Sequence, residues 1–129
     1  MSTDTTASVS THILDTSIGR PAEGVAITLA ARSGFDAQWV TLGGSATDAD
    51  GRCKDLPALP EGTTHVRLDF ETEAYFSKKQ AEAQQDAPRV RDSGAFFPEV
   101  AITFAVTPGE HYHVPLLLNP FGYSVYRGS

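Results

Sequence analysis

Three side chains in this 129-residue sequence could move protons and hold an anion: His12, Arg52 and His113. Histidine titrates near neutrality, so it is the usual general acid or base in enzymes. Arginine presents a fork of donors, which suits a planar anionic ring better than the point charge of lysine does. Each residue also has an ordinary interpretation, as a histidine at a sheet edge or as a solvated arginine beside a turn.

His111 and His113 are two residues apart, so they share one face if this segment forms a strand. Such a pair could bind a metal, but a catalytic zinc needs a third protein ligand, and we expect no metal here. The alternative is that one histidine is exposed and the other packs under a loop. Pro115 follows directly and cannot donate to a sheet, which predicts a sheet edge or a strand start at this point.

The chain ends on the polar segment Tyr126-Arg127-Gly128-Ser129. A terminus usually frays, and length alone favours that interpretation here. The functional interpretation is that the tail enters a cleft, where Arg127 and the Ser129 hydroxyl would reach a ligand and Gly128 would let the backbone bend. All four tail residues are therefore candidate substrate-binding residues.

Apolar and polar residues alternate along most of the chain, which predicts strands with one buried face. The predicted strands are 10–15, 25–30, 38–46, 65–71, 100–107, 111–118 and 122–127. Turn signals rich in Gly, Pro and Asp separate them, a spacing typical of an all-β sandwich. One short helix is predicted over 72–84, with Thr72 as its N-cap and a polar surface loop after it.

The composition is that of one ordinary globular domain, and we expect it to span residues 9–129 after a flexible extension over 1–8. The net charge of -6 argues against nucleic-acid and anionic-lipid partners. Cys53 is the single cysteine, so no intrachain disulfide can form, and we expect a buried filler rather than a nucleophile. The N-terminal segment is unlike a signal peptide and no apolar run could span a membrane, so we expect a cytoplasmic protein.

Several segments together resemble the 5-hydroxyisourate hydrolases, the transthyretin-like enzymes of urate breakdown. They are THILD at 11–15 with GRPA at 19–22, DADGRC at 48–53, FPEV at 97–100, HYHVPLL at 111–117 and YRGS at 126–129. The last two are the most specific. The loop over 84–95 matches no motif of the family.

The resemblance implies a transthyretin-like β-sandwich of two sheets with one short helix. It implies hydrolysis of 5-hydroxyisourate to 2-oxo-4-hydroxy-4-carboxy-5-ureidoimidazoline without a metal or cofactor. The family's catalytic set falls on His12, Arg52 and His113, and the tail with Ser129 completes the pocket; His111 matches a position outside that set. Family members are homotetramers, dimers of dimers whose active sites lie in a channel between the dimers.

Two other classes of function stay open at this point. A transthyretin-type carrier would bind a small hydrophobic molecule in the same channel. Such carriers resemble this chain in their strands, but they lack the histidine pattern of His12 and His113 and the Tyr-Arg-Gly-Ser end. An interaction module that pairs through an edge strand is the other class, and nothing specific in the sequence calls for it.

Overall fold

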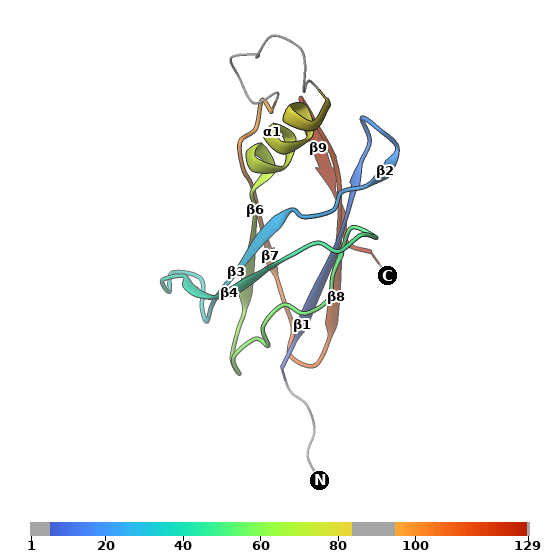
Figure 1. The fold of residues 1–129 in the computed structure, drawn as a ribbon. Helices are drawn as coiled ribbons and strands as arrows, with labels where there is room; N and C mark the ends of the chain where they lie inside the picture. Colours follow the sequence, from blue (N-terminus) through green and yellow to red (C-terminus); the bar gives the residue numbers. More distant parts are fainter. Residues whose placement is uncertain (1–5, 84–94, 129) are drawn as a thin grey trace.

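Two β-sheets packed face to face, with one helix at an end of the sandwich, form this molecule (Figure 1). The structure is a computed structural model, and it describes residues 6–83 and 95–128. The predicted all-β sandwich with one short helix is confirmed. Among the described residues, no helix is long and apolar enough to cross a membrane.

The first sheet has five strands and the second has four. The first runs in the order β2-β1-β8-β9, and β5 also pairs with β1; its strands are β1 (Ser8–Asp15), β2 (Arg20–Pro21), β5 (Arg52–Cys53), β8 (His111–Asn119) and β9 (Gly122–Val125). The second runs in the order β4-β3-β6-β7; its strands are β3 (Ala26–Arg32), β4 (Val40–Ala46), β6 (His65–Phe70) and β7 (Val100–Ala105).

The core lies between the sheets and follows from the period-two pattern. Alternate residues of β1 and β6 are buried. In β8, Tyr112, the run Val114–Leu116 and Leu118 are buried. The largest fully buried side chains include Phe70, Leu68, Leu29, Ile13 and Leu116. Burying such side chains stabilises the fold by roughly 1.5–3 kcal/mol each.

The helix α1 (Thr72–Ala83) begins where the sequence predicted it. The Thr72 hydroxyl donates a hydrogen bond to the carbonyl of Phe97, so it ties the first turn of the helix to the segment before β7. Further along α1, the Tyr75 hydroxyl donates to the buried carboxylate of Asp15 on β1, at 2.7 Å. These two bonds tie the helix to β1 and to the segment before β7. The expected loop over 84–95 lies outside the described residues, apart from Ala95.

Two predicted features of the strands differ in the structure. The first strand, predicted over 10–15, starts earlier, because β1 begins at Ser8, and Ala7 before it is already buried. The position predicted for Pro115 is wrong. This residue lies in the middle of β8, which pairs with β1 on one side and β9 on the other.

The break in the ladder beside β8 explains how a central strand accepts proline. In an extended strand the N–H and C=O of one residue point to the same side. The carbonyl of Pro115 accepts from the N–H of Tyr126 at 3.4 Å, so the missing donor faces the tail. There, regular pairing has ended at Leu116 and Val125, and it returns only as a bridge between His113 and Gly128.

Candidate active site

The outer face of the five-stranded sheet brings the candidate residues together. β1 and β8 run parallel, with Ser10 beside His113 and His12 beside Pro115. Because side chains alternate along a strand, the residues of each pair project to the same side. The half-buried His12 and His113 therefore lie on the outer face. Their neighbours in the sequence, Thr11 on β1 and Val114 on β8, are buried.

A tight turn places Arg52 on the same face. The Asp48 carboxylate accepts backbone N–H bonds from Asp50 at 2.9 Å and Arg52 at 3.0 Å, and these bonds hold the pKa of Asp48 below its ordinary value. Gly51 has a φ of 75°, and a Cβ there would collide with the carbonyl oxygen of Ile13. This close docking of the turn on β1 pairs Arg52 with His12 in the sheet.

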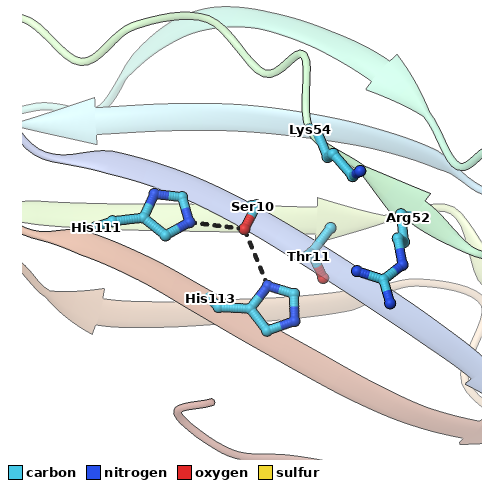
Figure 2. A pocket seen from close by; sticks show the side chains of 6 residues that line it. All are labelled: Ser10, Thr11, Arg52, Lys54, His111 and His113. Carbon is cyan, nitrogen blue, oxygen red and sulfur yellow. Dashed lines mark hydrogen bonds between the residues drawn. The ribbon is translucent and has the colours of Figure 1, made fainter. Parts of the chain in front are cut away.

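A pocket of about 230 Å³, which we call the polar pocket, lies on the outer face (Figure 2). It is lined by Ser10, Thr11, Arg52, Lys54, His111 and His113. Arg52 and Lys54 approach it from the strand β5 side, and the two histidines approach it from β8 (Figure 2). The pocket thus combines two fixed positive charges with two imidazole rings.

A serine hydroxyl lies between the two imidazole rings. Ser10 Oγ is 2.9 Å from Nδ1 of His113 and 2.9 Å from Nε2 of His111 (Figure 2). The remaining nitrogen of His111, Nδ1, lies 2.6 Å from the hydroxyl of Ser8. Four side chains from β1 and β8 therefore form one continuous hydrogen-bonded chain that ends at His113.

The tail backbone holds the opposite edge of the His113 ring. The N–H of Gly128 donates to the carbonyl of His113 at 2.8 Å. A Cβ on Gly128 would lie 2.9 Å from Cδ2 of His113 and 3.1 Å from Cγ of Pro115. Only glycine therefore lets the tail lie this close to the ring.

The surroundings of His113 favour its neutral form. Partial burial lowers the pKa of His113, and the positive charges of His12, His111 and Arg52 lower it further. A lowered pKa keeps the imidazole unprotonated, and so able to accept a proton, at neutral pH. The arrangement suits a general base beside a site for an anion.

Residues 9–128 of the chain match the HIUase/Transthyretin family. The chain belongs to this family. It is 40% identical over 123 residues to the 5-hydroxyisourate hydrolase of Salmonella dublin, covering 94% of this chain and 80% of that protein. The solved structure of Klebsiella pneumoniae 5-hydroxyisourate hydrolase is 34% identical, with a TM-score of 0.71, and the match covers 95% of this chain and 99% of that one. Sea bream transthyretin in complex with thyroxine is 27% identical, with a TM-score of 0.72 and 93% of each chain covered.

The HIUase/Transthyretin fold brings together the three residues that the sequence nominated, but not all in one pocket. Arg52 and His113 line the polar pocket. His12 lies next to Arg52 on the same face, yet it is outside the set of lining residues, and its Nε2 is 3.0 Å from the carbonyl oxygen of Asp50.

Two of the four tail residues point elsewhere. Tyr126 and Arg127 line a second pocket of about 250 Å³ between the sheets, which we call the apolar pocket, with Ile102, Phe104, Ala105, Tyr112, Val114 and Val125. Arg127 stacks over the ring of Tyr112, 4.5 Å from its centroid, and pairs with Glu110 at 3.2 Å. Gly128 reaches the polar side through its backbone, and Ser129 lies outside the described residues.

Sequence reasoning missed Ser10 and Lys54 as lining residues and left out His111. A signal was available, because Ser10 is two residues from His12 and Lys54 is two residues from Arg52, which places them on the same strand faces. Cys53, between Arg52 and Lys54, is buried in the core, as predicted, and its burial raises the pKa of the thiol. Within the described part of the chain, no three His, Cys, Asp or Glu side chains gather in a way that could hold a metal ion.

Proposed function

We propose that this protein hydrolyses 5-hydroxyisourate in urate degradation. The observation that carries the proposal is the meeting of Arg52 and His113 in one pocket of a chain that shares 40% identity with named 5-hydroxyisourate hydrolases. Ring opening by water needs a base, a donor for the developing oxyanion and a clamp on the ring. The polar pocket contains side chains for each of these tasks.

In this mechanism His113 takes a proton from water. Its lowered pKa supports the role, since a base must be unprotonated at the working pH. His12 is the second group that handles protons, and its position beside Arg52 on the outer face supports this.

The two cations of the pocket bind the ring and stabilise negative charge. The whole chain carries a net charge of -6, so an anionic ring is attracted only where positive charge is concentrated. Arg52 and Lys54 concentrate it at the polar pocket. The planar guanidinium of Arg52 would clamp adjacent oxygen and nitrogen atoms of the ring, and Lys54 would add a point charge.

The proposal includes a homotetramer, a dimer of dimers, in which the polar pocket faces a channel between the dimers. Its support is the open position of the pocket on the outer face of a sheet, where a second subunit could cover it. The position of Gly128 beside His113 supports a role for the end of the tail at the edge of the pocket. Light scattering should give four times the 13.8 kDa chain mass at micromolar concentration, and a monomer would remove the shared channel.

The test follows the decay of 5-hydroxyisourate generated in situ from urate, with and without the purified protein. We expect decay well above the spontaneous rate. In His113→Ala we expect turnover to fall by roughly 10²–10⁴, the usual contribution of a general base. A folded His113→Ala variant with near-full activity would show that the base has been assigned to the wrong residue.

The alternative is a carrier of the transthyretin type. Fold alone does not separate the two, because the likeness to a hydrolase and to a thyroxine-bound transthyretin is nearly the same, with TM-scores of 0.71 and 0.72. The two imidazoles and two cations of the polar pocket favour the hydrolase, since a carrier of hydrophobic molecules has no need of them. Tight binding of a hydrophobic ligand without any acceleration of decay would favour the carrier.

A further inference from the structure

The hydroxyl of Ser10 has two imidazole neighbours and a single hydrogen. It lies 2.9 Å from Nδ1 of His113 and 2.9 Å from Nε2 of His111, both within hydrogen-bond distance. With one proton and two lone pairs, it can donate to one ring while it accepts from the other. The direction chosen decides which nitrogen of His113 carries the proton, and hence what chemistry that ring can do.

The charges around His113 favour one direction. With Nδ1 bound to Ser10, the other nitrogen, Nε2, lies on the side of the ring that faces Arg52 (Figure 2). Arg52 and Lys54 have donors but no acceptors. A lone pair on Nε2 is attracted to these positive charges, whereas the partial positive charge of an N–H there would be repelled by them. None of the six side chains that line the polar pocket is acidic, so none would favour the opposite direction.

We propose that Ser10 is a positioning residue that accepts a hydrogen bond from Nδ1 of His113 and donates one to Nε2 of His111, so that His113 presents an unprotonated Nε2 to the pocket. His111 then donates from Nδ1 to Ser8, so both nitrogens of His111 have a partner, and Nε2 of His113 is left for the pocket. Gly128 lies so close to the Cδ2 edge of the ring that an added Cβ would collide with it, and with the bond to Ser10 this limits rotation of the ring. This gives His111 a part in the site, through Ser10 rather than by contact with substrate.

The inference rests on the proposed hydrolysis for its catalytic meaning. Water gives one proton to Nε2 of His113 while its oxygen bonds to the ring carbonyl carbon. The C–N bond then breaks with its electron pair on nitrogen, and that nitrogen takes the proton back from Nε2. The carboxylic acid formed releases the second water proton at neutral pH. Throughout, Ser10 accepts from Nδ1–H and so stabilises the transient imidazolium.

Nitrogen-15 NMR of the histidine rings tests the proton position without reference to any activity. At pH 8 we expect the wild-type His113 ring to be protonated on Nδ1, although a neutral histidine ring in water prefers Nε2. In Ser10→Ala the proton should shift toward Nε2, because Nδ1–H has lost its acceptor, although Arg52 and Lys54 still oppose an N–H on Nε2. Ser10→Thr keeps the hydroxyl and should keep the Nδ1 proton, and so should Ser8→Ala, which removes only the far end of the chain.

Kinetics of the same variants separate positioning from simple packing. Ser10→Ala should lower kcat by about 10-fold, the loss of one hydrogen bond, with little change in KM. The acid limb of its pH profile should move to lower pH, because the imidazolium has lost its acceptor while His12, His111, Arg52 and Lys54 still repel it. Ser10→Thr should restore both kcat and the limb.

The outcomes distinguish this inference from the proposed function. A wild-type ring protonated on Nε2, or a Ser10→Ala variant with unchanged kcat and pH profile, would overturn the role of Ser10 while the hydrolase stands. A folded Ser10→Thr variant that behaves like Ser10→Ala would do the same. A wild-type protein with the Nδ1 proton, lost in Ser10→Ala, but with no acceleration of 5-hydroxyisourate decay would support the placement of Ser10 and overturn the hydrolase.

Discussion

The polar pocket and the apolar pocket are nearly equal in size, at about 230 and 250 Å³, and they share the strand β8, but their linings are opposite in character. His111 and His113 face the polar pocket, and Tyr112 and Val114 face the apolar one. Because side chains alternate along a strand, the two histidines project from one side of β8, and Tyr112 and Val114 project from the other. The outward side presents chemistry and the inward side continues the core.

The tail repeats this division over three residues. Tyr126 and Arg127 line the apolar pocket, whereas the backbone of Gly128 lies against the His113 ring. Arg127 is held by Glu110 and by the face of Tyr112, so it anchors the tail on the far side from the proposed chemistry. The comparison separates residues that act in the site from residues that hold it in place, and mutations can test that separation.

Deletion of Tyr126–Ser129 should have the largest effect, because it removes both the anchor and the backbone that packs on His113. We expect turnover to fall by at least roughly 10²-fold, as a misplaced catalytic group commonly causes. The circular dichroism spectrum should remain that of a folded β protein, and light scattering should give the same oligomeric state as for the wild type. Normal turnover in the deletion variant would separate the tail from the site altogether.

Leu116→Ala changes the inward side of β8 alone. Leu116 is fully buried, so its truncation should lower the free energy of unfolding by about 2–5 kcal/mol. Turnover per folded molecule should stay close to that of the wild type. Denaturant titration and decay kinetics on one preparation measure both quantities. A loss of turnover without a loss of stability would mean that the two sides of the strand are not independent.

Arg52→Lys is the converse change, on the outward side. It keeps the positive charge but removes the planar fork, and we expect kcat/KM to fall roughly 10- to 100-fold. Stability should hardly change, since Arg52 is exposed. If lysine supports full activity, charge alone suffices at this position and the guanidinium does not clamp the ring.

Gly128→Ala and Arg127→Ala compare neighbouring tail residues that face the two pockets. The new methyl group at residue 128 would press on the His113 ring, so turnover should fall by about 10-fold or more. Arg127→Ala removes an exposed ion pair worth about 0–1 kcal/mol, so its turnover should fall less. Decay rates measured in parallel give the order, and the reverse order would place Arg127 rather than Gly128 at the site.

The smallest expected effect is a shift in the pH dependence of kcat/KM for the wild-type protein. Because the pKa of His113 is lowered from 6.5, its unprotonated form persists below that pH. The decline of kcat/KM on the acid side should therefore be centred below pH 6.5, where His113 takes up a proton. A decline centred at or above 6.5 would show that His113 is not the titrating base.

Much of the fold could be predicted from the sequence, because one buried face produces a period-two pattern, which is clear in β1 and β6. The short strands β2 and β5 could not, since two residues carry no period. Pro115 was misplaced because its tolerance depends on the break between β9 and Gly128, which is a property of the neighbouring segment.

The candidate site divides in the same way. His113 and Arg52 carry recognisable chemistry, so they could be nominated from the sequence. The spacing of Ser10 from His12 places both on one strand face, but the role of Ser10 could not be predicted from it. That role depends on the parallel register, which places Ser10 between two histidines of β8, more than 100 residues further along the chain. The direction of the Arg127 side chain likewise depends on Glu110 and Tyr112, which sequence spacing does not reveal.

The central claim is that the polar pocket, not the apolar pocket, receives the substrate. A crystal structure of the protein soaked with urate, the ring from which 5-hydroxyisourate forms, tests it most directly. The account predicts the ring in the polar pocket, with its oxygen or nitrogen atoms within hydrogen-bond distance of Arg52 and an edge toward Nε2 of His113. A ring bound among Phe104, Tyr112 and Val125 in the apolar pocket would contradict it.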